Sequence, residues 1–123
     1  NFETSMQHEH PVETYGVKFN FDGQKVALLT DTRIFSALET FYSGVDILII
    51  NVVLFVAKPE IFHLSFPEVE DLVLKLKPKK VILTHFGMSM LRENPAILAQ
   101  DLSTRTGIPV VAAEDRLSID LNL

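Results

Sequence analysis

The fold is decided by the stretch Asp46-Ile47-Leu48-Ile49-Ile50-Asn51, a short apolar run bounded by polar residues. Such a run indicates a buried β-strand. A second run of the same kind, residues 80–84, follows after a helical pattern and ends at His85. The order strand, helix, strand predicts a parallel crossover and therefore an α/β layered domain.

The predicted helix between these two strands carries its own start and stop signals. Ser65 is followed three residues later by Glu68, which is the spacing of a capping box. Pro78 ends the helix. Its buried stripe is expected to consist of Phe66, Val69, Leu72, Val73 and Leu76. Residues 52–64, before the helix, show no periodicity, and we interpret them as a loop over a site.

Upstream of the first run, the pattern predicts a hairpin and a helix. Residues 17–21 alternate apolar and polar side chains, Asp22-Gly23 is a hairpin turn signal, and residues 25–30 indicate a more fully buried strand. The helix that follows is expected to end at Gly44. Its apolar face would consist of Ile34, Leu38, Phe41 and Tyr42.

Downstream of His85, the sequence predicts one more helix and two short strands. Asn94-Pro95 opens the helix, with Asn94 as its cap, and Gly107 ends it. The strands are expected at residues 110–112 and 117–121, on either side of a turn. That turn is Glu114-Asp115-Arg116.

Composition limits the classes of protein that the chain can belong to. Its 123 residues, 47% of them hydrophobic, suit one domain over residues 1–123. The net charge of −5 gives no broad electrostatic footprint for nucleic acid. Without cysteine, disulfides and thiolate metal ligands are excluded, and a cytoplasmic location is expected. No apolar run reaches the roughly 18 residues of a membrane span, and the polar start shows no signal peptide.

Three of the predicted strands end in residues that can do chemistry: Asp31, Asn51 and His85. In open α/β sheets, ligands gather beyond the carboxyl ends of the strands. His10 precedes a hairpin that could bring it to the same place. Imidazole and carboxylate groups suit zinc, manganese or iron. However, a lone histidine after a strand is more often a packed or surface residue, so the pattern alone leaves both interpretations open.

Six short motifs, taken in order, resemble the metallo-β-lactamase family, and in particular its ribonuclease Z and cyclic phosphodiesterase branch. The resemblance extends over residues 8–121. The matching segments are His10-Pro11-Val12-Glu13-Thr14-Tyr15-Gly16, Leu29-Thr30-Asp31-Thr32, residues 46–51, His63-Leu64-Ser65, Ile82-Leu83-Thr84-His85-Phe86-Gly87 and Ala113-Glu114-Asp115.

The resemblance implies the C-terminal half of a metallo-β-lactamase αββα sandwich, an α/β fold whose mixed sheet carries helices on one face. The family's histidine-x-histidine-x-aspartate-histidine cluster belongs to the N-terminal half, and His8-Glu9-His10-Pro11 does not reproduce it. An uncovered apolar sheet face of this size marks an interface. We therefore expect the N-terminal half or a second copy of the chain to cover it, so that the protein is a dimer or another oligomer.

The resemblance also implies a site for two divalent metal ions, zinc first, with manganese or iron as alternatives. In that site His10, Asp31 and His85 are metal ligands, Asp31 bridges both ions as a catalytic residue, and His63 protonates the leaving group. Asp31 and His85 are thus expected to lie close together. The implied substrate is a phosphodiester, in a small molecule or an RNA end. One departure is Asn51, which stands where the family has a glutamate beside the catalytic histidine; asparagine can orient an imidazole but supplies no charge.

Other functions stay open beside this one. The same site could hydrolyse a thiolester or a lactone. Alternatively, the chain could be a non-catalytic half-domain that binds a partner. A receiver-like domain would need an acidic pair after an earlier strand, and no such pair stands upstream.

Each candidate residue also has a structural interpretation. His8 is expected in an exposed loop, Asp31 could cap the helix that follows it, and His63 could simply be a helix-entry residue. The basic cluster is interpreted as a solvated helix end, with a phosphate-steering patch as the alternative. That cluster consists of Lys75, Lys77, Lys79 and Lys80.

Overall fold

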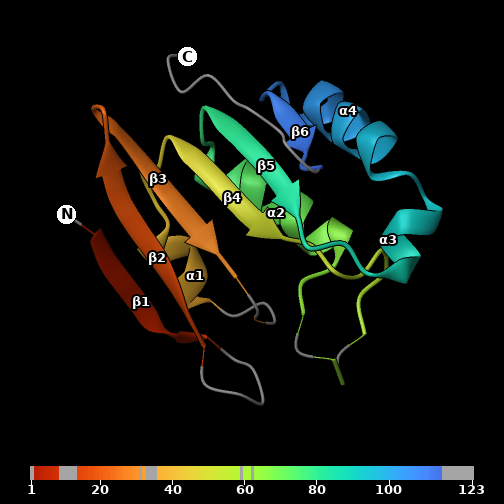
Figure 1. Cartoon of the computed structure of the whole chain (residues 1–123), viewed down its shortest axis with the longest axis horizontal. Coiled ribbons are helices and arrows are strands. Elements are labelled where there is room, and N and C mark those ends of the chain that lie inside the picture. The colour runs from red at the N-terminus through yellow and green to blue at the C-terminus, as the bar shows by residue number, and fades with distance from the viewer. Residues whose placement is uncertain are drawn as a thin grey trace.

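The strands of the described chain lie side by side in one sheet in their sequence order, β1-β2-β3-β4-β5-β6. The structure is a computed structural model that describes residues 2–8, 14–30, 32, 36–58, 60–61 and 63–114, with side chains from residue 16 onward. Figure 1 shows the arrangement. The elements are β1 (Phe2–His8), β2 (Thr14–Phe21), β3 (Gln24–Leu29), α1 (Ala37–Phe41), β4 (Ile47–Asn51), α2 (Phe66–Leu76), β5 (Lys80–Thr84), α3 (Met88–Arg92), α4 (Pro95–Thr106) and β6 (Val110–Ala112).

The sheet is mixed because two kinds of connection join its strands. β1, β2 and β3 are antiparallel, and a tight turn at Asp22 and Gly23, both with positive φ, joins β2 to β3. From β3 to β6 the strands are parallel, and a helical crossover lies between each pair. This arrangement confirms the α/β fold class that the alternation of strands and helices predicts.

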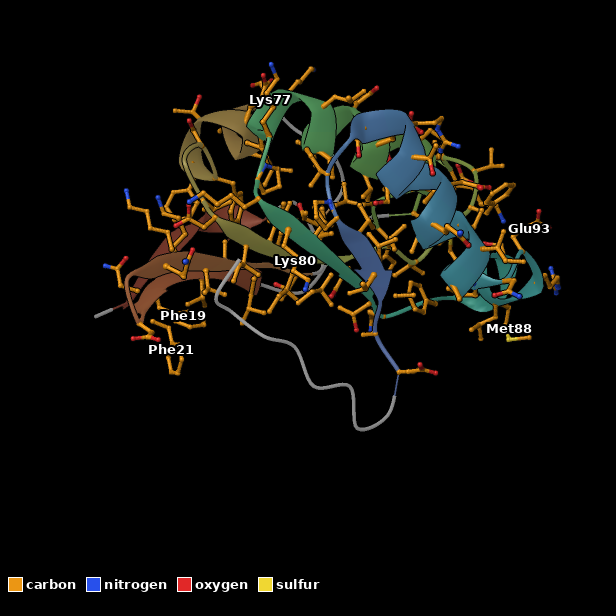
Figure 2. All side chains as sticks on the ribbon, turned by 90° about the horizontal axis from the view of Figure 1, so that it is seen from above. Phe19, Phe21, Lys77, Lys80, Met88 and Glu93 are labelled. Carbon is orange, nitrogen blue, oxygen red and sulfur yellow. The ribbon has the colours of Figure 1, made fainter. Side chains whose placement is uncertain are left out.

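One face of the sheet is covered by α1, α2 and α4, which form a layer on the same side (Figure 2). Successive side chains of a strand point to opposite faces, so every second residue of β3, β4 and β5 faces this layer. The helices bury Leu38 of α1, Val73 of α2 and Leu102 of α4 against these strands. The strand residues in this core include Ala27, Leu29, Leu48, Ile50, Val81 and Leu83.

The opposite face of the sheet, here called the second face, is also apolar. Val26, Ile47 and Ile82 are buried there, and Phe19 and Ile49 pack against them half-buried. Phe19 and Phe21 point away from the layer formed by α1, α2 and α4 in Figure 2. The sequence-based expectation of helices on one face of a mixed sheet is therefore confirmed.

The capping box at the start of α2 is confirmed by its hydrogen bonds. The backbone N–H of Ser65 donates to Glu68 Oε1 at 2.9 Å, and the Ser65 hydroxyl donates to the same oxygen at 2.8 Å. Ser65 is fully buried. The bonds satisfy a backbone donor that the helix itself leaves without a partner and so fix where α2 begins.

Two elements, β1 and α3, are missing from the sequence-based prediction. β1 includes His8, which pairs with Thr14 of β2, so the interpretation of His8 as a loop residue is wrong. The pairing shifts register between Thr4 and Gln7, and such a shift breaks the strict alternation by which a strand is recognised. α3 has five residues, too few for a helical period to show in the sequence.

Some predictions fall on residues outside the described ranges. They are the start of the first helix at Ile34, the strand at 117–121 and the turn that continues from Glu114. Within the described ranges, α1 begins at Ala37. None of the described helices is long and apolar enough to cross a membrane.

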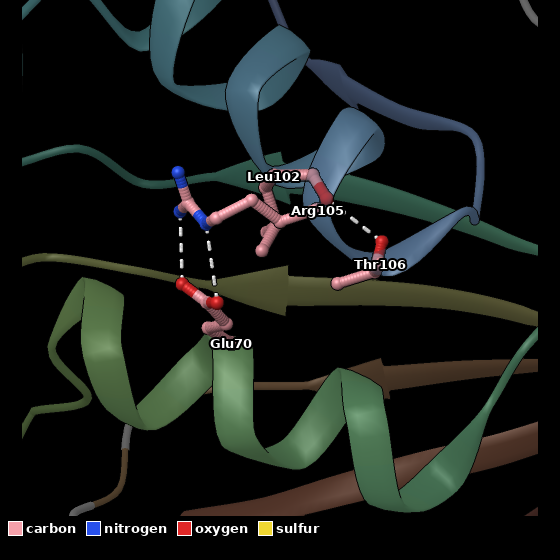
Figure 3. A network of polar contacts seen from close by, with 4 residues as sticks. All are labelled: Glu70, Leu102, Arg105 and Thr106. Carbon is pink, nitrogen blue, oxygen red and sulfur yellow. Dashed lines mark hydrogen bonds and ion pairs between the residues drawn. The ribbon is translucent and has the colours of Figure 1, made fainter.

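An ion pair joins the two long helices across their exposed side (Figure 3). Arg105 of α4 donates from Nε to Glu70 Oε2 at 3.2 Å and from Nη2 to Glu70 Oε1 at 2.8 Å. This hydrogen bonding raises the pKa of Arg105 above its ordinary value, so the guanidinium stays charged. The Arg105 side chain is 46% exposed and that of Glu70 is 27% exposed, so water screens the pair.

Glu70→Ala is expected to destabilise the fold by no more than about 1 kcal/mol, because exposed ion pairs contribute about that much at most. Chemical denaturation of the wild type and the variant measures the difference. The effect should shrink further in high salt, which screens exposed charges. A loss of several kcal/mol would show instead that the helix layer depends on this pair.

Candidate metal site

The candidate site lies where the parallel strands end. β3 ends at Leu29, β4 at Asn51 and β5 at Thr84. In the pairing of the sheet, Leu29 lies beside Ile50, and Asn51 lies beside Thr84. The carboxyl ends of the three strands therefore meet at one edge, which is where open α/β sheets bind their ligands.

His85 leaves this edge in an unusual backbone conformation. It directly follows Thr84, its side chain is exposed, and its φ of 58° is in the left-handed region. A residue other than glycine rarely adopts such a φ, and when it does the strain often marks a functional position. This left-handed conformation changes the direction of the chain immediately after β5, at the residue that carries the imidazole.

Gly87 brings the chain after His85 into close contact with the segment that follows β4. Its backbone N–H donates to the carbonyl oxygen of Val53 at 3.1 Å. A Cβ at this position would lie 2.6 Å from the same oxygen and 2.9 Å from Val53 Cγ1. Only glycine fits, because the first of these contacts is to backbone that cannot move aside cheaply.

The imidazole of His63 lies near that of His85. The centroids of the two rings are 6.4 Å apart, with 44° between the ring planes. His63 is half-buried and stands just before Ser65, the residue that caps α2. The fold therefore brings together two of the four predicted site residues, which are 22 positions apart in the sequence.

The other two predicted site residues, His10 and Asp31, lie outside the described residues. The predicted closeness of Asp31 and His85 therefore remains a prediction. Thr32, next to Asp31, is fully buried, and Asn51 is half-buried at the end of β4. Among the described residues, no group of three or more His, Cys, Asp or Glu side chains gathers to hold a metal.

Of the predicted metal ligands, the structure describes His85 alone. Its imidazole is a nitrogen ligand that zinc takes. A catalytic zinc usually has three protein ligands. His85 would therefore need further donors, such as the predicted His10 and Asp31, whereas His63 beside it is the predicted general acid.

The lysine cluster does not border the two imidazoles. Lys80 starts β5, whereas His85 follows the end of that strand, so the cluster lies at the opposite edge of the sheet. Lys75 Nζ is 3.7 Å from Glu39, and Lys79 Nζ is 3.6 Å from Asp46. These neighbours favour the interpretation as a solvated helix end over a patch that steers phosphate to the site.

The sequence alone predicts no role for Gly87 or Ser89, although both hydrogen-bond to the backbone of the segment that follows β4. Gly87 has a φ of −83°, which any residue adopts, so nothing in its local conformation calls for glycine. Ser89 accepts a hydrogen bond on Oγ from the backbone N–H of Phe55 at 3.1 Å. Both roles depend on contacts with a segment more than 30 positions away, which no local pattern reveals.

The family described as beta-lactamase superfamily domain matches residues 2–86, and the chain belongs to that family. An uncharacterized protein of Methanocaldococcus jannaschii is 29% identical over 126 residues, which cover 98% of this chain and 47% of that protein.

Solved structures show the same fold. The metallo-beta-lactamase fold protein YhfI from Bacillus subtilis matches with a TM-score of 0.77 and 17% identity over 92% of this chain and 46% of its own. Human tRNase Z, short form, matches with a TM-score of 0.72 and 18% identity over 99% of this chain and 43% of its own. The chain thus has the metallo-β-lactamase fold but spans about half the length of the proteins it matches.

Proposed function

We propose that the protein is a metal-dependent hydrolase that cleaves phosphodiester bonds, active when the rest of the fold completes this chain. The observation that carries the proposal is the closeness of the His63 and His85 rings, whose centroids are 6.4 Å apart. They meet at the edge of the sheet where such folds place their chemistry. Membership of the family supports a metal site, and the likeness to human tRNase Z favours a phosphodiester substrate.

His85, Asp31 and His10 are proposed as the residues that would hold the metal ions, of which zinc is the first candidate. When bound, two such ions supply Lewis acidity that stabilises the charge developing on the phosphoryl group. The exposed position of His85 at the strand end suits a ligand that faces an open site. The strained backbone at this residue suits a side chain that must be held in one direction.

His63 is proposed to be the general acid. Its half-buried imidazole lies beside that of His85, and the proposal therefore places it next to a substrate held at the same site. A positioned imidazole can give that oxygen the proton it needs to depart. Asn51, at the end of the neighbouring strand β4, is proposed to orient the imidazole without changing its charge.

The second face of the sheet is proposed to receive the other half of the αββα sandwich, either from the same protein or from a second copy. The half-buried Phe19 and Ile49 on that face support this, because an apolar surface of this kind is normally covered. The covering half would also bring the remaining metal ligands. A cytoplasmic location belongs to the same proposal.

Removal of metal from the full-length protein is expected to abolish phosphodiesterase activity. The test treats the protein with a chelator, assays hydrolysis of bis(p-nitrophenyl) phosphate, and then adds back zinc or manganese. Activity should disappear with the metal and return with it. Full activity in the metal-free protein would refute the proposal, and metal-dependent cleavage of a thiolester but not of the phosphodiester would change the substrate class.

A further inference from the structure

A short segment, residues 52–55, lies between the chain stretches that carry the two imidazoles. We infer that this segment, here called the yoke, fixes the position of His63 relative to His85, and that Gly87 and Ser89 are positioning residues that hold it. The inference rests on the proposed function for its use, but its geometry is independent of the reaction. It gives roles to residues that neither bind a metal nor touch a substrate.

On one side the yoke is bonded to the chain just after His63. The N–H of Leu54 donates to the carbonyl of Leu64 at 3.2 Å, and the N–H of Phe66 donates to the carbonyl of Leu54 at 2.7 Å. These two bonds form an isolated parallel bridge between Leu54 and Ser65. The Phe55 ring also stacks on that of Phe66, with centroids 6.3 Å apart. The backbone that follows His63 is thereby fixed to the yoke.

On the other side the yoke is bonded to the chain around His85. The N–H of Val52 donates to the carbonyl of Thr84 at 2.9 Å, and the N–H of Gly87 donates to the carbonyl of Val53 at 3.1 Å. The N–H of Phe55 donates to Ser89 Oγ at 3.1 Å. Contacts therefore occur at positions before and after His85, and they hold its backbone from both sides.

The yoke is hydrogen-bonded to both neighbouring segments. Val52, Val53 and Phe55 bond toward the His85 side, whereas Leu54 bonds toward the His63 side. A change in either neighbour is therefore passed through the yoke to the other histidine.

The test compares Ser89→Ala with Ser103→Ala in the metal-free full-length protein. Both changes remove a part-buried hydroxyl that hydrogen-bonds to backbone. Ser103 lies on α4, away from the site, and donates to the carbonyl of Ile108, which follows that helix. The readouts are the side-chain NMR signals of His63 and His85 and the zinc dissociation constant. Ser89→Ala is expected to shift both imidazole signals and to weaken zinc binding about tenfold, as losses of supporting residues do. Ser89→Thr, which keeps a hydroxyl acceptor, should restore both.

Gly87→Ala provides a second variant, because its methyl group pushes the Val53 carbonyl away. It should shift the same two imidazole signals more strongly than Ser89→Ala does. Imidazole signals that stay as unchanged in Ser89→Ala as in Ser103→Ala would overturn the inference. If the signals move as expected but the protein neither binds metal nor hydrolyses a phosphodiester, the positioning role stands and the proposed function fails.

Discussion

Replacing His85 by alanine is expected to remove most metal-dependent hydrolysis, whereas replacing His63 should leave the metal bound and only slow turnover. The centroids of the two rings are only 6.4 Å apart. A difference between the two variants would therefore reflect the different roles proposed for the side chains and not a difference in their location. Loss of a ligand weakens the binding of the metal ion. Loss of a general acid typically lowers the rate by a factor of about 10² to 10⁴ without removing the metal.

The dependence of turnover on the leaving group distinguishes a general acid from a structural residue at position 63. A nitrophenolate departs without a proton, so its release should be little affected in His63→Ala. A basic alkoxide needs the proton, and its release should show the full loss. The measurement is turnover of a series of phosphodiesters with leaving groups of rising basicity, together with the metal content of each variant. An equal loss across the series would mean that His63 only supports the entry to α2.

Ile49→Asp is expected to destabilise the full-length protein by about 4 kcal/mol or more, the range reached when an unpaired charge is buried. Ile49 stands in the middle of β4 on the second face, with Leu28 and Ile82 as its neighbours in the adjacent strands. It is only half-buried in this chain. A large loss would therefore come from the other half of the sandwich covering this face. Urea unfolding of the full-length protein measures the change.

Two matched substitutions serve as controls for Ile49→Asp. Ile49→Val keeps the face apolar and should cost about 0.5–1.5 kcal/mol. Val56→Asp introduces the same charge at a residue that is 61% exposed, so stability should stay within about 0.5 kcal/mol of the wild type. A loss for Ile49→Asp no larger than that for Val56→Asp would mean that the second face stays open to water.

The parts of the fold that could be predicted from sequence are those with a local cause. The strands around Ile49 and Ile82 show as apolar runs, and the start of α2 shows as the Ser65–Glu68 spacing; both are confirmed. β1 could not be predicted because its shifted register breaks the alternation, and α3 because one turn has no period.

The candidate site was predictable to the extent that its residues stand at strand ends. His85 follows a recognisable strand, and the register of β4 and β5 places it at the edge where ligands bind. The pairing of His63 with His85 and the role of Gly87 depend on how the loop of residues 52–64 packs. That packing is set by backbone bonds between distant segments, such as Gly87 to Val53, and no periodic pattern encodes them.

The left-handed backbone at His85 sets the stability of the fold against the role proposed for this side chain. A side chain in that conformation costs about 1–2 kcal/mol, which glycine would avoid. Selection for stability alone would therefore replace this histidine, and a search for thermostable variants would recover glycine there. Glycine would also remove the imidazole to which we assign a metal ion, so design that keeps the proposed activity should leave the position unchanged.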